Sequence, residues 1–248
     1  MSDWALWLTL VFVLIAVLLS LWQRIGLERE IVISTARTAV QLFAIGYVLQ
    51  FVFHTDHPAL ILLLILMMIG VASWNAARRG KDLPAVIWPV AVTLSATELF
   101  TMALLLGLRI IAPTPQYLVP LSGMIIGNSM IVCGLFLSHM KREVEASRGE
   151  IETLLCLGAN IRQAIQDVLK RSVKSSLIPT FDTMKTLGLV QLPGTMTGMI
   201  IAGANPLEAV RYQILIMFTF SASAVVSAVL LSLLSYKRWF TDQKMLRG

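Results

Sequence analysis

Residues 58–74 read PALILLLILMMIGVASW, a run without a charged side chain that is long enough for a membrane-spanning helix. Six further apolar runs cover residues 4–22, 37–53, 86–108, 117–140, 186–203 and 212–236. Of the 248 residues, 57% are hydrophobic and only 14% are charged, whereas soluble domains carry roughly 25% charged residues. The sequence therefore predicts an all-α, polytopic membrane protein with about seven transmembrane helices and excludes an ordinary soluble enzyme.

Short polar segments separate these runs. His54–Pro58 and Ala112–Pro115 contain prolines and polar residues that stop helices, so both are expected to be tight turns. The first three residues carry no basic charge, and the apolar run that follows is longer than the core of a signal peptide. We therefore expect residues 4–22 to remain as the first span.

Basic residues indicate the orientation. In a seven-span arrangement, 18 of the 20 Lys and Arg fall on one side, and only Arg109 and Arg211 fall on the other. The positive side of a membrane protein is cytoplasmic, which predicts an external N-terminus and a cytoplasmic C-terminus. The basic residues are not interleaved with aromatic residues, so no nucleic-acid partner is expected. Cys133 and Cys156 lie in an apolar run and a polar loop, and no disulfide is expected between them.

Residues 141–185 form the one large cytoplasmic segment of this arrangement, between transmembrane residues 1–140 and 186–248. Two helices are expected in it. Ser147 and Glu150 have the spacing of a capping box at the start of the first helix, and Gly158 suits the position after its end. The second helix is amphipathic, is capped by Asn160 with Gln163, and is expected to lie along the membrane surface; the first presents a small apolar face suited to a partner's groove, formed by Ile151, Leu154 and Leu155.

The first of these helices also carries a partial motif. Glu152 and Gly158 have the spacing of the Glu-Ala-Ala-x-x-x-Gly loop with which ABC permeases contact their ATPase, although Thr153 and Leu154 replace the alanines. The alternative is an amphipathic connector that packs on the chain's own spans. The sequence has no Gly-x-x-x-x-Gly-Lys-Ser/Thr phosphate loop, so an ATP-driven transporter would need its ATPase on another polypeptide.

Polar residues within the spans are candidates for a substrate pathway because they are costly in hydrocarbon. Glu98 lies about 18 Å into its span at about 1.5 Å per residue. Asn128 and Thr197 come out at nearly the same depth, and Gln41 in the second span completes the predicted set. Glu98 is also the candidate metal ligand; one carboxylate is too few ligands for a hard cation, so such a site would need a two-fold dimer. The alternative is a protonated Glu98 that is hydrogen-bonded to a neighbouring helix.

Small residues indicate helix packing or a hinge. Gly123 with Gly127, and Gly194 with Gly198, have the G-x-x-x-G spacing that allows helices to approach closely, either within or between protomers. Pro193 directly precedes the second pair and is expected to kink or break the sixth helix.

Three segments carry a resemblance to a known family. Residues 123–130 read GMIIGNSM, residues 155–159 read LCLGA and residues 188–198 read GLVQLPGTMTG. Together with Asn205-Pro206 and Tyr212-Gln213-Ile214, they make the chain resemble the FetB (YbbM) family of ABC-transporter permeases over nearly its whole length.

The resemblance implies a non-enzymatic permease subunit of the bacterial inner membrane that exports iron in metal homeostasis and oxidative-stress resistance. It implies a FetA-like ATPase partner that uses ATP and magnesium, with no cofactor bound by this chain. Two permeases would form a homodimer, coupled to the ATPase through Glu152, Leu155, Gly158 and Ala159. Other substrates, such as a nucleotide sugar, and a stand-alone secondary transporter that uses Glu98, are the alternatives.

Overall fold

The computed structural model describes residues 8–55, 57–81, 83–241, 243 and 245–246. The chain divides into an N-terminal unit, residues 1–57, and a C-terminal unit, residues 58–248. Within the described residues, the regular elements are helices, and the only β-type pairings are two isolated bridges. The predicted all-α class is confirmed.

The N-terminal unit is a helical hairpin of α2 (Leu10–Trp22) and α3 (Glu28–Thr55). Its turn is closed by the Ser20 hydroxyl, which donates to a Glu28 carboxylate oxygen at 2.8 Å and accepts from the Leu27 N–H at 3.2 Å. α3 begins nine residues before the predicted span at residues 37–53, because the turn that ends at Leu27 is followed directly by helix, with Glu28 and Glu30 in its first turn. The predicted first span, residues 4–22, lies partly outside the described residues.

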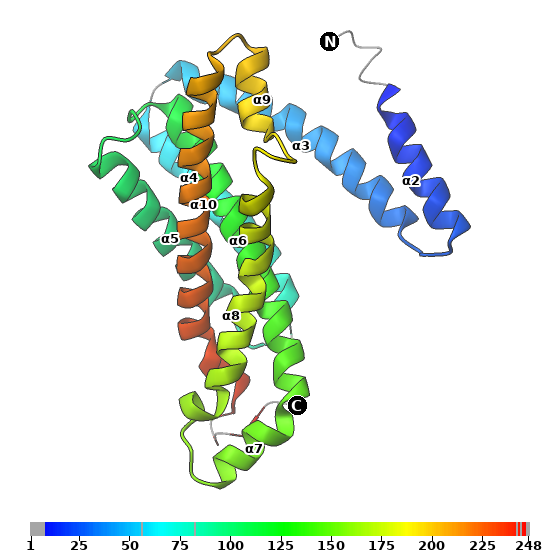
Figure 1. Cartoon of the computed structure of the whole chain (residues 1–248), viewed down its shortest axis with the longest axis vertical. Coiled ribbons are helices and arrows are strands. Elements are labelled where there is room, and N and C mark those ends of the chain that lie inside the picture. The colour runs from blue at the N-terminus through cyan, green and yellow to red at the C-terminus, as the bar shows by residue number, and fades with distance from the viewer. Residues whose placement is uncertain (1–7, 56, 82, 242, 244, 247–248) are drawn as a thin grey trace. The chain divides into compact units, whose positions relative to one another are not determined.

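The C-terminal unit is built around five long helices, α4 (Pro58–Ala77), α5 (Ile87–Gly107), α6 (Pro115–Ala146), α8 (Ile161–Thr186) and α10 (Pro206–Ser235). α6 packs against the other four, and α10 packs against α5, α6 and α8 (Figure 1). Short helices complete the unit: η1 (Arg78–Gly80), α7 (Arg148–Cys156), α9 (Gly194–Ile201) and η2 (Tyr236–Trp239). α5 ends at Gly107 and α6 begins at Pro115, which confirms the predicted turn at Ala112–Pro115. Asp56 of the other predicted turn, His54–Pro58, lies outside the described residues.

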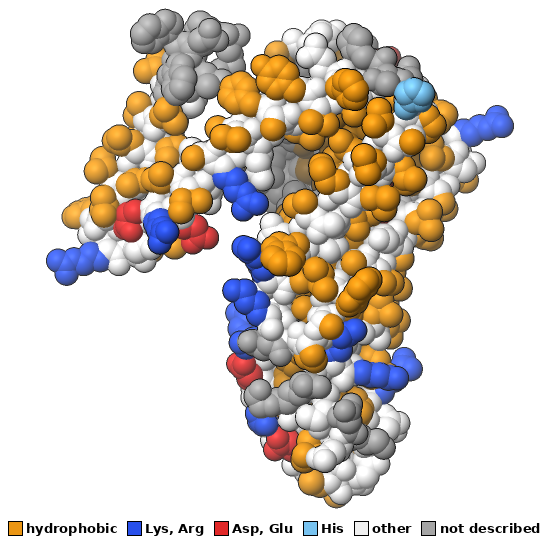
Figure 2. Space-filling view, turned by 180° about the vertical axis from the view of Figure 1, so that it is seen from behind, with side chains coloured by type: hydrophobic (Ala, Val, Ile, Leu, Met, Phe, Trp, Pro, Cys, Tyr) orange, Lys and Arg blue, Asp and Glu red, His pale blue; other side chains and the backbone are white. Residues whose placement is uncertain are grey.

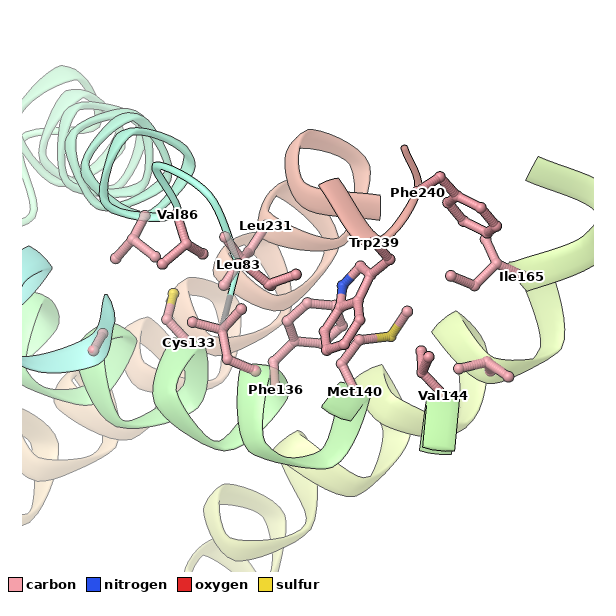
Figure 3. Close-up of a cluster of buried hydrophobic side chains, with 14 of the residues drawn as sticks. Leu83, Val86, Cys133, Phe136, Met140, Val144, Ile165, Leu231, Trp239 and Phe240 are labelled. Atoms are coloured by element: carbon pink, nitrogen blue, oxygen red, sulfur yellow. The ribbon is translucent and has the colours of Figure 1, made fainter. Parts of the chain in front are cut away.

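The largest hydrophobic core lies towards the end of the bundle that carries α7. Phe136 and Met140 of α6 are fully buried there, and Ile165 of α8 and Leu231 of α10 belong to the same cluster. Figure 3 shows Trp239 of η2 lying among these side chains. The segment after α10 therefore helps to hold α6, α8 and α10 together.

Five helices among the described residues are long and apolar enough to cross a membrane: Glu28–Val52, Pro58–Gly80, Ile87–Gly107, Pro115–Ala146 and Pro206–Trp239. Large apolar side chains are exposed along these helices, as expected where lipid replaces water. Figure 2 shows hydrophobic side chains spread over one face of the bundle. The chain is a polytopic membrane protein, and the number of seven crossings stays a prediction.

The prediction that residues 186–203 form a membrane span with a kink or break near its start is wrong. α8 ends at Thr186, Gly188 has a φ of +82°, and α9 has only 8 residues. Such a helix is about 12 Å long, which is too short to cross a bilayer. Pro193 directly precedes the first helical residue of α9, but the helix before it already ends at Thr186, so the break begins ahead of this proline.

The expectation that a helix after Asn160 lies along the membrane surface is also wrong. α8 packs along α6 and α10, and its Leu177 is buried in one cluster with Val132 of α6 and Ala228 of α10. The side of α8 that enters the bundle carries Ser172 and Ser176, which are small enough for close packing but lower the hydropathy of the helix. Because of this composition, the sequence pattern of α8 looks like that of an amphipathic helix at a membrane surface, although the helix packs within the bundle.

The two predicted helix caps have different outcomes. Asn160 accepts from the Gln163 N–H and the Gln163 side chain accepts from the Asn160 N–H, both at 2.9 Å, which confirms the capping box of α8. Ser147 makes no such bond at the start of α7, because its hydroxyl accepts from the Arg171 guanidinium at 2.9 Å. Gly158, with a φ of +92°, follows the end of α7 as predicted.

The apolar face of α7 does not lie open to a partner's groove, contrary to the expectation. Ile151 is buried in the main core, and Leu154 and Leu155 are partly buried against it. The face that the sequence predicted for a partner is therefore buried against the chain's own α6 and α8, driven by the hydrophobic effect.

Candidate functional site

Polar side chains line the contacts between α5, α6 and α10 in the interior of the C-terminal unit. On α5, four of them recur at helical spacing and so share one side of the helix. All but one of these side chains are buried, and Asn128 is half-buried. We call this set the polar cluster; its members are Thr93, Thr97, Glu98, Thr101, Ser122, Asn128, Ser129, Ser223 and Ser227.

The polar cluster connects all three helices. The Thr97 and Ser227 hydroxyls lie 3.1 Å apart between α5 and α10. The Asn128 amide of α6 donates to the Phe220 carbonyl at 3.1 Å and to the Ser223 hydroxyl at 3.4 Å on α10. Small hydroxyl residues let membrane helices approach closely and satisfy one another's polar atoms.

Glu98 is the exception to this mutual satisfaction. Its side chain belongs to a residue that is only 5% exposed, and neither carboxyl oxygen has a hydrogen-bond partner among the described residues. The Ser122 hydroxyl of α6 faces this carboxyl and interacts with it, although neither group makes a hydrogen bond of ordinary geometry; among the described residues, the hydroxyls of Thr93 and Ser129 also lack a partner. Burying a carboxyl without a partner is costly, so a position of this kind calls for a functional explanation.

The polar cluster offers one carboxyl, several hydroxyls and one amide. Oxygen atoms of these types bind hard cations, exchange protons or hydrogen-bond to polar organic molecules. Among the described residues, no group of three or more His, Cys, Asp or Glu side chains could hold a metal ion. A single copy of the chain therefore presents only part of a metal coordination sphere here.

The residues predicted for the pathway occupy different places. Glu98 and Asn128 both belong to the polar cluster, on α5 and α6. Thr197 lies on α9, which packs against α10, and it takes no part in the bonds of the cluster. Gln41 lies exposed on α3 in the N-terminal unit. The structure brings the first two to the same set of helix contacts.

The sequence interpretation missed the hydroxyl residues of the cluster. Thr93, Thr97 and Thr101 recur every fourth residue in a largely apolar helix, and Ser223 and Ser227 have the same spacing on α10. Residues four apart share a helix face, so this spacing was the signal that could have found them.

The two G-x-x-x-G motifs do not mark the closest helix contacts of the chain. A Cβ at Gly123 would meet the Met68 side chain at an ordinary 3.8 Å, and at Gly127, Gly194 and Gly198 it would meet nothing within 4 Å. The tightest glycine among the described residues is Gly134, where a Cβ would lie 3.0 Å from Cδ of Arg79, followed by Gly80, where it would lie 3.2 Å from Cδ1 of Leu137.

The residues predicted for ATPase coupling lie at the α7 end of the bundle. Glu152 forms an ion pair with Arg148 at 2.9 Å, and both side chains are about half exposed. Leu155 contributes to the core, whereas Gly158 and the neighbouring Leu157 are exposed at the end of α7. The solvent side of α7 is therefore the part that a partner could reach.

Comparisons with known proteins show similarity over almost the entire length of the chain. The model of the uncharacterised protein family UPF0014 matches residues 3–240. The chain is 47% identical to the UPF0014 membrane protein YjkA of Bacillus subtilis over 100% of this chain and 99% of that protein. It is 39% identical to the protein ALUMINUM SENSITIVE 3 of Arabidopsis thaliana, over 96% of this chain and 87% of that protein.

A further relative carries a functional name. The chain is 34% identical to the "Probable iron export permease protein FetB" of Escherichia coli, over 99% of this chain and 95% of that protein. No solved structure is significantly similar to the chain. The chain belongs to the UPF0014 family of membrane proteins.

Proposed function

We propose that this chain is the membrane-spanning permease subunit of an ABC transporter that exports iron across the bacterial inner membrane. Two features support the proposal. A relative at 34% identity over almost the entire chain is named as an iron export permease. The sequence is that of a helical membrane protein without a phosphate loop of its own, so ATP and magnesium would be bound by a separate ATPase subunit.

The single observation that carries the proposed pathway is the buried, unpartnered carboxyl of Glu98 in the polar cluster. A carboxyl held inside a helical bundle without a partner is suited to receive a cation or a polar group of the substrate. The hydroxyls of Ser122 and Ser129 would supply additional oxygen atoms when the helices shift.

Iron needs more ligands than one chain provides at this place. A homodimer would double the number of Glu98 carboxyls, and this requirement supports a working unit of two permeases. With the N-terminus outside and the C-terminus in the cytoplasm, the α7 end would face the ATPase. The exposed side of α7, with Glu152, Leu157 and Gly158, would then transmit the ATPase movement to the bundle.

Substitution of Glu98 tests the pathway. The permease would be reconstituted in liposomes with its candidate ATPase, and ATP-dependent movement of ferrous iron would be measured. We expect Glu98→Gln to lower iron transport about tenfold or more, which corresponds to about 1.4 kcal/mol of lost interaction or more. ATP-independent properties, such as the yield of the folded protein, should not change.

A matched variant controls for the loss of a carboxylate elsewhere. Glu208 is exposed in the first turn of α10, at the other end of the bundle from α7, and Glu208→Gln should leave iron transport at the wild-type level. Wild-type transport in Glu98→Gln would contradict the assignment of the pathway to the polar cluster.

The same carboxyl also favours a second candidate function. A stand-alone secondary transporter could use Glu98 as its proton or ion carrier and would need no ATPase. Transport by the chain alone in liposomes with an imposed proton gradient distinguishes the two. An ABC permease for another polar substrate, such as a nucleotide sugar, would couple to ATP hydrolysis without a response to iron.

A further inference from the structure

A second apolar cluster adjoins the polar cluster on the side away from α7. Its buried members come from α5, α6 and α10 and from the segment after α5: Leu105, Ile111, Leu121, Ile125 and Ile216. Leu121 directly precedes Ser122 of the polar cluster. On the α7 side, the main core begins with Leu94, one helical turn before Glu98. The polar cluster therefore lies between two apolar clusters along the bundle.

A polar side chain of α10 lies beyond the second apolar cluster. Gln213 is three residues before Ile216, so both lie on the same side of the helix. At about 1.5 Å per residue, Gln213 is about 15 Å farther along α10 than Ser223 of the polar cluster. The rings of Tyr117 and Tyr212, with centroids 6.4 Å apart, place this level of α10 beside the first turn of α6. Figure 1 shows the start of α10 and α7 at opposite ends of the bundle.

Gln213 is buried, and its acceptor atom is unsatisfied. The residue is only 3% exposed, and Oε1 of its amide has no hydrogen-bond partner among the described residues. A buried acceptor without a partner lowers the stability of a protein, and an apolar side chain of similar size would avoid this loss. Packing of the helices therefore does not account for an amide at this position.

We propose that Gln213 is a second substrate-binding position of the transport pathway, between the second apolar cluster and the end of the bundle opposite α7. The inference deepens the proposed function and rests on it, since Glu98 is taken as the first position. The oxygen of an amide side chain accepts hydrogen bonds and binds cations, as carboxylate oxygens do. The ligand at Gln213 is thus a cation or a hydrogen-bond donor.

Two separate positions suit stepwise movement of a substrate. The amide of Gln213 is neutral, so it holds a cation less tightly than the carboxylate of Glu98 does. Binding along a transport pathway must be strong enough for entry and weak enough for release. The second apolar cluster lies between the two positions in this conformation, so its side chains must separate when the substrate passes. Gln213 then receives the substrate before it leaves the bundle.

Removal of the amide tests this position through transport, binding and stability together. In liposomes with the candidate ATPase, Gln213→Leu should lower the ATP-dependent movement of ferrous iron about fivefold. Equilibrium binding of ferrous iron without ATP should stay at the wild-type level, because Glu98 is retained. Thermal stability should be unchanged or higher, because an unsatisfied buried acceptor is removed. A structural role of Gln213 predicts the opposite, a less stable protein.

The matched control removes a satisfied polar group from the other end of the same helix. Ser235 is buried, and its hydroxyl donates to the Leu231 carbonyl at 2.6 Å. Ser235→Ala should move iron at the wild-type rate. Wild-type transport in Gln213→Leu, an equal loss in both variants, or a loss of transport in Gln213→Leu that accompanies lower thermal stability would overturn the proposal.

Thiol labelling provides a readout that needs no iron. Cys156 is exposed at the end of α7, so a membrane-impermeant thiol reagent that labels the wild-type chain identifies the α7 side of the membrane. In a Cys156→Ser background, which keeps the buried Cys133, Gln213→Cys should be labelled only from the opposite side. Leu231→Cys, which is 0% exposed in the main core on the same helix, should be labelled from neither side. Gln213→Cys that is as protected as Leu231→Cys would overturn the proposal.

The two proposals fail separately in these experiments. No movement of iron by the wild-type complex would refute the proposed function, and labelling of Gln213→Cys would still decide whether the second position is reached from the membrane side opposite α7. With wild-type transport intact, unaffected transport in Gln213→Leu would refute the second position alone.

Discussion

Single residues determine where neighbouring segments of the bundle approach each other closely. Gly134 of α6 is buried, and Arg79 crosses it so closely that a Cβ would lie 3.0 Å from Cδ and 3.3 Å from Nε of the arginine. A Cβ at Gly127 on the same helix would meet no atom within 4 Å. Gly134 thus allows a close contact and Gly127 does not, although Gly127 is the one of the two that belongs to a G-x-x-x-G motif.

The contrast predicts different effects of one substitution. Gly134→Leu should lower the free energy of unfolding by about 1–3 kcal/mol, because the added side chain overpacks the contact with Arg79. Gly127→Leu should change it little. Thermal unfolding of the purified protein in detergent measures both. Equal loss of stability in the two variants would contradict the assignment of the close contact to Gly134.

Structural features with a local cause were predictable from the sequence. Asn160 with Gln163 caps a helix through neighbouring backbone groups, and Pro193 lies directly before the first residue of a helix. The place of Glu98 near the middle of an apolar helix was predictable for the same reason, by counting along one helix. The absence of a cap at Ser147 was not, because its hydroxyl accepts a bond from Arg171, which is 24 residues away.

At the scale of elements, α7 and α8 differ most from the sequence interpretation. α7 was expected to present its apolar face to a partner and α8 to lie along the membrane surface, yet α7 buries Ile151 in the main core and α8 packs along two long helices. Amphipathic periodicity shows that one side of a helix is covered but not by what. For α7, the remaining exposed side, which includes Glu152, is the surface left for a partner.

This remaining surface yields a prediction for the ATPase contact. Glu152→Arg should lower the amount of ATPase that co-purifies with the permease, since it reverses the charge on the exposed side of α7 and breaks the pair with Arg148. The pair itself is exposed and contributes about 0–1 kcal/mol or less to folding, so the fold should persist. Glu208→Arg, at the opposite end of the bundle, is the control and should co-purify normally.

Unchanged co-purification of Glu152→Arg would place the ATPase contact away from α7. A simultaneous loss in Glu208→Arg would instead indicate a general effect of added positive charge. Only a selective loss at Glu152 supports coupling through α7.

At the scale of the whole molecule, the membrane class was predictable because it depends on composition summed over long runs. The assignment of the penultimate crossing was not, because it depends on packing between segments. α8 lies in the bundle where residues 186–203 had been expected to span, and the chain then continues through α9 to α10. The direction of the last long helix relative to α6 is the same in both arrangements, so this correction does not require a different orientation of the C-terminus.

The most direct measurement of the central claim is transport by the reconstituted complex. Liposomes containing this chain and its candidate ATPase would be supplied with ATP and ferrous iron, and ATP hydrolysis and iron movement would be recorded together. The account predicts that hydrolysis rises with iron and that iron moves away from the ATPase side only when both subunits and ATP are present. Iron movement that is independent of ATP, or no movement in the complete complex, would contradict it.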